Sequence, residues 1–426
     1  MSFQQGLSGL NAASKNLDVI GHNIANSNTV GFKASRAEFA EMVASAIGSA
    51  GGSNAGIGVE VAAVAQQFTQ GNLTITGNSL DVAINGNGFF TLTLPDGTPA
   101  YTRSGNFKLD KEGNMITNDN ASVMGYPVDP VTGLRSGTDP IPMVFPTAEP
   151  IPAKQTTTIT AAFNLDARAT DAAGDPAATP PIPATPRATY GTSINVFDSQ
   201  GVAKPVSLYF QKTATANTWD VYDQLDDPTA VPPVVATPIG QITFDNNGAI
   251  TGPVATPPAT GFSLPLTVNP TPPNPNNLPT YTVDVSLDKV TQFGTKFAVS
   301  NLSQDGYTSG ELTGINIENN GMIMTRYSNG VTRAEGQLAL SSFRNTQGLA
   351  SVGSNNWVAT FESGQPVAGT ATDGNFGSLR SGALEDSNVD LTAELVNMMT
   401  AQRAYQANAQ TIKTQDQVMS TLVNLR

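Results

Sequence analysis

Few residues of this chain have side chains that could do chemistry. The sequence has 426 residues, with no cysteine and one histidine, His22. Thiolate catalysis, disulfides, iron–sulfur clusters, cysteine-ligated zinc and histidine-cluster metal sites are therefore excluded. A Ser-His-Asp triad would have to use His22, which lies among Asn23, Asn26 and Asn28 at the expected end of a helix. We predict that His22 has a capping or turn role and no catalytic one.

Glycine motifs and carboxylates do not indicate an active site either. No segment matches the phosphate loop GxxxxGK, and Gly86-Asn-Gly88 runs into Phe89-Phe90 instead of opening a helix, unlike a dinucleotide fingerprint. The 34 acidic residues leave a paired-carboxylate hydrolase open, although no pair stands out. We predict no catalytic residue, no metal site and no cofactor.

The charge balance narrows the class of partner. Lys and Arg number 21 against 34 Asp and Glu, which gives a net charge of −13. Nucleic-acid binding depends on Lys and Arg at phosphates, so this balance argues against it. Charged residues are 13% of the chain, about half of the ~25% in an ordinary soluble domain. A surface rich in amides and hydroxyls instead suits close packing against other protein.

No segment predicts a membrane span or an ordinary secretory signal. No apolar run approaches the ~18–20 residues that cross a bilayer. The first 14 residues carry neither Lys nor Arg and no continuous apolar core. The lack of cysteine fits either a cytosolic protein or one that is exported unfolded through a narrow route.

Proline divides the chain into the elements that must position these residues. Of the 29 prolines, two lie in residues 1–126, 26 in 127–279 and one in 280–426. Because proline lacks a backbone donor, its clusters fit loops and strand edges of an all-β middle. The patterns around 110–113, 198–201, 245–248 and 318–321 each start with Asp or Glu and end with Gly, which predicts hairpin turns. The small, glycine-rich residues 45–58 predict a flexible loop.

Both ends of the chain have the periodicity of amphipathic helices. Apolar residues step by three or four from Phe3 to Ile24, and others repeat every seven residues near the C-terminus. Ser387-Asn-Val-Asp390 matches a capping box, and Glu385, Asp386, Asp390 and Glu394 would place negative charge at the helix N-terminus. The predicted assembly residues are Leu7, Leu10, Leu17, Ile20 and Ile24 in the first helix and Leu391, Leu395, Met398, Tyr405, Ile412 and Met419 in the second.

The apolar residues of each predicted helix form a stripe along one face, and each stripe needs another surface to pack against. Burial of one stripe against one surface is marginal against the conformational entropy lost on ordering it. The simplest arrangement pairs the two terminal helices as a coiled coil. Flanking residues such as Val19, Met399 and Leu422 would stay exposed in that pair, which calls for helices from other subunits. We expect the termini to be poorly ordered in the free monomer and to form a helical layer on assembly.

Three long segments resemble the family of flagellar rod and hook proteins. Residues 6–33 include Asn23-Ile-Ala-Asn26 and Gly31-Phe32-Lys33, residues 70–90 include Gly77-Asn78-Ser-Leu80-Asp81, and residues 381–409 include Asn388-Val-Asp390-Leu391. The family-motif residues are Asn23, Asn26, Gly31, Phe32, Asn388, Asp390, Gln402 and Asn408. The proline-rich insertion between the shared ends is similar to hook-type members, since rod-type members lack a large insertion. Lys204-Pro205 departs from the histidine expected there.

The resemblance implies a mainly β fold with long α-helical termini and discontinuous, nested domains. These are a terminal helical coiled-coil domain (1–30 and 386–426), a linker loop (31–70), an inner β domain (71–145 and 303–385) and an outer inserted β domain (146–302). It also implies a structural subunit that self-assembles into a curved, flexible tube outside the cell. Such a tube joins rod to filament as a universal joint that transmits torque.

The same resemblance implies the partners. Subunits of this family pass unfolded through the flagellar export apparatus, which accounts for the missing signal peptide. The expected partners are further copies of the chain, rod proteins, the hook cap, the hook–filament junction proteins and the export apparatus. Nucleic acid and a membrane span are not expected.

Three other interpretations stay open. A distal rod protein of the same family would form straight, rigid polymers. A secreted adhesive or carbohydrate-binding β protein would account for the middle of the chain but not for its helical ends. A carboxylate-based hydrolase would lose turnover when one acid is changed.

Overall fold

The fold is mainly β, with one long helix near each terminus. The computed structural model describes residues 2–43, 56–130, 132–146, 149–226, 235–255, 261–269 and 278–424. The helices are α1 (Ser2–Ala25) and α2 (Leu391–Asn424), as the two stripes predict. No helix within those ranges has the length and apolar character needed to cross a membrane.

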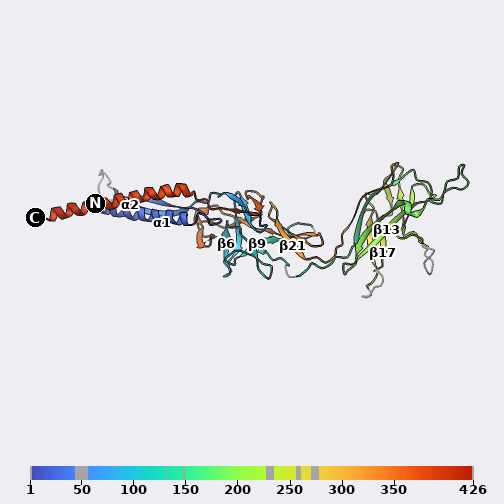
Figure 1. Ribbon diagram of the computed structural model, residues 1–426, viewed down its shortest axis with the longest axis horizontal. Coiled ribbons are helices and arrows are strands. Elements are labelled where there is room, and N and C mark those ends of the chain that lie inside the picture. The colour runs from blue at the N-terminus through green and yellow to red at the C-terminus, as the bar shows by residue number, and fades with distance from the viewer. Residues whose placement is uncertain are drawn as a thin grey trace. The chain divides into compact units, whose positions relative to one another are not determined.

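The chain folds into two units. Unit 1 comprises Met1–Glu149, Leu312–Tyr327 and Thr332–Arg426, and unit 2 comprises Pro150–Glu311 and Ser328–Val331. Figure 1 shows α1 and α2 side by side in unit 1, together with the β-strands of the same unit. Residues 303–311, expected in the inner β domain, belong to unit 2, because β20 (Ala298–Gln304) pairs with β11 (Thr158–Asp166) of that unit.

An antiparallel sheet of 13 strands forms the centre of unit 1. Its core includes Phe90, Leu92, Met115 and Leu340, all of them fully buried. The main path runs through β21 (Leu312–Ile317), β22 (Met322–Tyr327), β23 (Thr332–Leu338), β9 (Ser122–Pro127), β5 (Phe89–Thr93), β6 (Pro99–Thr102), β26 (Asn356–Val358) and β25 (Ala350–Gly353). The remaining strands are β7 (Lys108–Leu109), β8 (Met115–Ile116), β10 (Ile141–Pro142), β24 (Leu340–Ser342) and β27 (Val367–Gly369).

Small sheets in unit 1 join segments from the two ends of the sequence. β3 (Leu73–Ile75) pairs with β29 (Ala383–Glu385), and β4 (Val82–Asn85) pairs with β28 (Ser378–Ser381). The short 3₁₀ helix η2 (Thr346–Gly348) also lies in this unit. These pairings place the start of α2 beside the strands that follow α1.

The prediction of a linker loop over residues 31–70 is wrong for much of that range. β1 (Ser35–Val43) and β2 (Gly56–Gln66) form an antiparallel two-stranded sheet there. Val59-Glu-Val61 alternates as a strand does, and its β-branched residues favour strands. Residues 44–55, most of the expected flexible loop, lie outside the described residues.

Unit 2 contains two five-stranded sheets around one core. Trp219, Phe163 and Phe210 lie in that core and are buried. In the first sheet, β11 pairs in parallel with β18 (Tyr281–Ser286) and β19 (Thr291–Phe293) and antiparallel with β20, and β17 (Ser263–Val268) pairs with β18. The second sheet runs β12 (Gly191–Phe197), β13 (Ala203–Lys212), β14 (Thr218–Tyr222), β15 (Gly240–Phe244) and β16 (Ile250–Gly252), and η1 (Arg187–Tyr190) precedes β12.

The four predicted hairpin turns are confirmed. Gly113, Gly201, Gly248 and Gly321 have φ between 81° and 86°, the left-handed region that favours glycine. In the first turn, the amide of Gly113 donates to the carbonyl of Asp110 at 3.1 Å, and the Asp110 carboxylate accepts from the amides of Glu112 and Asn114. The Asp198 and Asp245 carboxylates accept amides in the same way, whereas in the fourth turn Asn320 Oδ1 accepts from the Met322 amide at 2.9 Å.

Candidate functional site

Helices α1 and α2 are antiparallel and pack against each other along one face of each helix (Figure 1). A Cβ added at Gly6 would meet Ile412 Cγ1 at 3.2 Å, and one added at Gly9 would meet the Asn408 amide at 2.9 Å. Higher residue numbers in α1 thus face lower numbers in α2. The glycines let the two backbones approach closely, as small residues do at helix–helix contacts.

The helix contact buries only part of the predicted assembly residues. Ile20 is buried, together with Ala12, Ala13 and Ala401. Leu10, Leu17, Ile24, Met398 and Ile412 are partly exposed. Leu7, Leu391, Leu395, Tyr405 and Met419 are exposed, by 38% to 61%.

The outward face of α2 is apolar and uncovered within one chain. Val396 and Met399 are 52% and 54% exposed, beside Leu395 at 47%. α2 is also longer than α1, with 34 residues against 24, so its last turns extend past the start of α1 (Figure 1). Met419 lies in that extension and is 61% exposed. A face of this kind is typical of helices that pack against a further chain.

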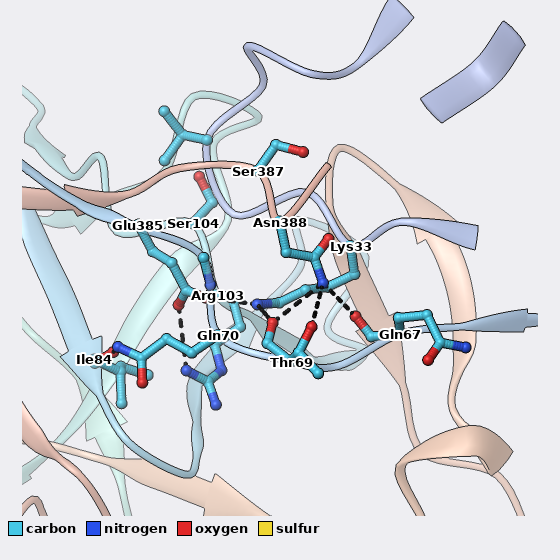
Figure 2. Close-up of polar contacts among 12 residues, drawn as sticks. Lys33, Gln67, Thr69, Gln70, Ile84, Arg103, Ser104, Glu385, Ser387 and Asn388 are labelled. Atoms are coloured by element: carbon cyan, nitrogen blue, oxygen red, sulfur yellow. Dashed lines mark hydrogen bonds and ion pairs between the residues drawn. The ribbon is translucent and has the colours of Figure 1, made fainter. Parts of the chain in front are cut away.

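A buried ionic cluster fixes both helices to the sheets of unit 1 (Figure 2). We call Lys33, Arg103 and Glu385 the junction cluster. Lys33 Nζ donates to Glu385 Oε1 at 2.5 Å, and Arg103 Nη1 donates to Glu385 Oε2 at 3.2 Å. The side chains of Lys33 and Glu385 are fully buried, and that of Arg103 is nearly so. Lys33 follows α1 and Glu385 precedes α2, so one carboxylate ties both ends of the chain together.

Backbone carbonyls accept further hydrogen bonds from both cations, while the buried Arg103 Nε has no hydrogen-bond partner among the described residues. Lys33 Nζ also donates to the Thr69 carbonyl at 2.8 Å, and Arg103 Nη2 donates to the Gly86 carbonyl at 2.9 Å. The Arg103 guanidinium lies 5.3 Å from the centre of the Phe89 ring, within cation–π range. Burial lowers the pKa of Lys33 and of Arg103, and the adjacent Glu385 carboxylate counteracts that shift in both.

Two asparagines tie the helix ends to neighbouring backbone. Asn388 Oδ1 accepts from the Ala34 amide at 2.7 Å, while its Nδ2 donates to the Gln67 carbonyl at 2.7 Å and to Thr69 Oγ1 at 2.9 Å (Figure 2). Asn23, which is buried, donates to and accepts from the backbone of Ser35 at 2.8 Å each way. An asparagine side chain has both donors and an acceptor, which these contacts require.

The chemistry of this site is that of a structural junction. Its carboxylate is saturated by two cations and by the Gly71 amide, 3.0 Å from Glu385 Oε1. Across the described ranges, no group of three or more His, Asp or Glu side chains could hold a metal ion. The arrangement joins the segments that flank both helices to the sheets of unit 1.

Family models of flagellar proteins match successive parts of the sequence. "Flagella basal body rod protein" matches residues 3–33, and "Flagellar hook protein FlgE/F/G D1 domain" matches 83–164. "Flagellar basal body protein FlaE D2 domain" matches 164–307, and "Flagellar basal body rod FlgEFG protein C-terminal" matches 380–425. The flagellar hook proteins FlgE of Escherichia coli and Salmonella typhimurium are each 43% identical to this chain, with 100% of both chains covered.

The chain belongs to the flagellar hook protein family. The hook protein FlgE of Borreliella burgdorferi is 33% identical, covering 100% of this chain and 99% of its own. The crystal structure of the Helicobacter pylori flagellar hook protein FlgE2 has a TM-score of 0.53 at 15% identity and covers 73% of this chain and 100% of its own. That likeness shows a shared fold with a hook protein. A structural role in the flagellar hook follows from the family.

The remaining motif residues of this hook family member lie in the segment that follows α1 and along α2. Gly31 has φ 70°, and a Cβ there would meet the Ser104 amide at 2.7 Å, so glycine is required. Phe32 is buried and packs edge-on against the His22 ring at 5.5 Å. Asn26 Nδ2 donates to the His22 carbonyl at 2.9 Å in the turn after α1. Gln402 is exposed on α2, and Asn408 faces Gly9.

The predicted cap of the second helix is shifted along the sequence. Asp390, not Ser387, is the N-cap of α2: its carboxylate accepts from the amides of Thr392 at 2.9 Å and Ala393 at 3.1 Å. Glu385 was expected to contribute charge at the helix N-terminus, but its side chain is buried in the junction cluster instead. The sequence pattern missed Lys33, Arg103 and Glu385 as partners because only the folded β3–β29 and β4–β28 pairings bring them together.

Proposed function

We propose that this chain polymerises into the curved, flexible tube of the bacterial flagellar hook through its terminal helices. The observation that carries the proposal is the uncovered apolar face of α2, where Leu395, Val396 and Met399 are about half exposed in the single chain. Copies stacked around a channel would bury this face and extend the α1–α2 contact into a coiled coil. The hook then joins rod to filament and transmits torque.

The insertion of unit 2 within the sequence of unit 1 is compatible with a flexible mechanical joint. Unit 2 is an insertion between residues 149 and 312 of unit 1. We assign the terminal helices, 1–30 and 386–426, to the channel, the sheets of unit 1 to the tube wall, and unit 2 to the outside. The buried junction cluster suits a rigid inner layer. A weakly charged outer unit, rich in hydroxyl and amide side chains, suits contacts that exchange as the tube bends.

The proposed role sets the location and the partners. The subunit would be exported unfolded through the flagellar export apparatus and would assemble outside the cell. Its contacts would be further copies, rod proteins below, the hook cap during growth and the hook–filament junction proteins above. The proposal assigns no reaction to the chain.

Electron microscopy and circular dichroism of the purified full chain test this function. We expect curved tubes, and a higher helix content in the polymer than in the monomer because the terminal helices become ordered on assembly. Straight, rigid polymers would favour a distal rod protein instead. Equal helix content in monomer and polymer would refute ordering of the termini on assembly.

A further inference from the structure

A buried carboxylate oxygen on α2 has no partner within one chain. Glu394 Oε2 is inaccessible to solvent, and no hydrogen-bond donor reaches it among the described residues. The Glu394 side chain lines a groove of about 410 Å³ between α1, α2 and the start of β1, which we call the α2 groove. Asn16, Asn23, Asn397 and Thr400 line the same groove. A buried acceptor without a hydrogen bond is costly, so this groove is incomplete in the isolated chain.

The same helix carries a cation without a partner. Arg403 is exposed, and within the described part of the chain it makes neither an ion pair nor a hydrogen bond. It lies on the outward face of α2, since it is close in helical angle to Val396 and Met399, which are about half exposed. Arginine within an exposed apolar patch is typical of a protein–protein interface.

Helix geometry places these two residues on opposite faces of α2. Glu394 lies seven residues before the buried Ala401, so it shares the face that packs on α1. Arg403 lies nine residues after Glu394, which is about half a turn round the helix and roughly 13–14 Å along it. The two side chains of one copy therefore cannot meet. Complementary groups on opposite faces produce a head-to-tail contact, which repeats without closing into a dimer.

We propose that Arg403 of one copy enters the α2 groove of the next copy and pairs with Glu394. This inference rests on the proposed polymerisation and names a contact within it. The apolar residues Val396 and Met399 around Arg403 would cover the groove and exclude water from the ion pair. A bidentate guanidinium–carboxylate pair with excluded solvent fixes the register between neighbouring helices.

Arg36 is the rival partner inside the same chain. It lines the α2 groove, but its guanidinium pairs with Glu38 at 2.8 Å and its side chain is 66% exposed. If Arg36 formed the ion pair with Glu394, substitutions of Arg403 would leave polymerisation unaffected. A mixture of two chains separates the possibilities.

The test uses charge reversal in the full chain. Glu394→Arg alone and Arg403→Glu alone place like charges at every contact, and we expect each to raise the critical concentration for polymerisation at least tenfold. An equimolar mixture of the two variants restores opposite charges between alternating copies, so we expect polymer near the wild-type concentration. Lys413→Glu and Asp416→Arg, which reverse other exposed charges of α2, serve as matched controls and are expected to polymerise normally.

Cross-linking gives a second readout that does not depend on a change in stability. The natural chain has no cysteine, so Glu394→Cys/Arg403→Cys carries the only two thiols. A short bis-maleimide should give a ladder of multimers from polymer and none from monomer. The proposed ion pair would be overturned if both single reversals polymerised normally, or if the mixture needed as high a concentration as either variant alone. It would also be overturned if the polymer gave no ladder. Each of these results would leave the hook function intact. Failure of the wild-type chain to polymerise would overturn both.

Discussion

Lys33 and Glu385 are 352 residues apart in the sequence, yet their side chains form a fully buried ion pair with a 2.5 Å Nζ–Oε1 distance. Lys33 follows the first helix and Glu385 precedes the second. The pair therefore joins the two ends of the sequence within unit 1. One carboxylate thus connects the segments that lead into both helices.

Removal of the shared carboxylate should destabilise unit 1. Glu385→Gln would leave Lys33 and Arg103 as two buried cations without a counter-charge, which costs about 3–5 kcal/mol when one partner of a buried pair is lost. Denaturant unfolding of the monomer measures this free energy. Glu112→Gln breaks the exposed pair with Lys111 and is the matched control, expected to change stability by ~0–1 kcal/mol. Equal effects of the two variants would contradict the role of the junction cluster.

Close approach of the two helices should make Gly9 sensitive to a methyl group. Alanine in a helix interior is about 1 kcal/mol better than glycine. Gly9→Ala would bring its Cβ within 2.9 Å of the Asn408 amide, whereas a Cβ at Gly21 meets nothing within 4 Å. In the assembled polymer, where both helices are ordered, we expect Gly21→Ala to raise the melting temperature and Gly9→Ala to lower it. A rise in both would show that α1 and α2 do not pack as described.

Asp305 should make unit 2 sensitive to acid. Burial alone would raise the pKa of Asp305, but hydrogen bonds from Thr158, Thr157 and Lys154 outweigh it and lower the pKa to about 2. An unfolded aspartate has a pKa of about 3.9. Because the folded pKa is the lower one, the stabilisation is present above pH ~4 and is lost as the pH falls towards 2.

The unfolding of unit 2 can be followed separately. The sequence has two tryptophans, and Trp219 lies in unit 2 while Trp357 lies in unit 1. In a Trp357→Phe background, Trp219 fluorescence should report acid destabilisation between about pH 4 and 2 that Asp305→Asn greatly reduces. An unchanged pH profile in Asp305→Asn would contradict the assignment.

The apolar face of α2 should matter for assembly and not for monomer stability. Met399→Ser removes a side chain that is 54% exposed, so we expect the monomer to change by less than ~0.5 kcal/mol. Polymerisation should require a several-fold higher concentration, because the lost apolar area is buried only between copies. Val235→Ser, on a residue of unit 2 that is 77% exposed, is the control. Unaltered assembly of Met399→Ser would count against this face.

Local signals predicted both helices and all four hairpin turns. The three- and four-residue steps from Phe3 to Ile24 and the seven-residue repeat after Leu391 correspond to α1 and α2. The glycines at the ends of the turns have the positive φ that their position requires. These features depend on neighbours in the sequence, and so a pattern reveals them.

Contacts between distant residues could not be predicted in the same way. Nothing near Arg103 indicates that its guanidinium meets Glu385, since the contact depends on how strands from both ends of the sequence pair. The pairing of β1 with β2 lies inside the expected linker loop, and its register depends on the fold and not on a local pattern. The unpaired Oε2 of Glu394 is equally a property of the packed helices and not of the sequence.

Electron microscopy and sedimentation of the chain truncated before Leu391 test the central claim most directly. The truncation removes α2 and leaves the sheets and their cores, including the Lys33–Glu385 pair. We predict a soluble monomer with intact β-sheet circular dichroism and no polymer at concentrations where the full chain forms tubes. Tubes from the truncated chain would contradict assembly through the terminal helices.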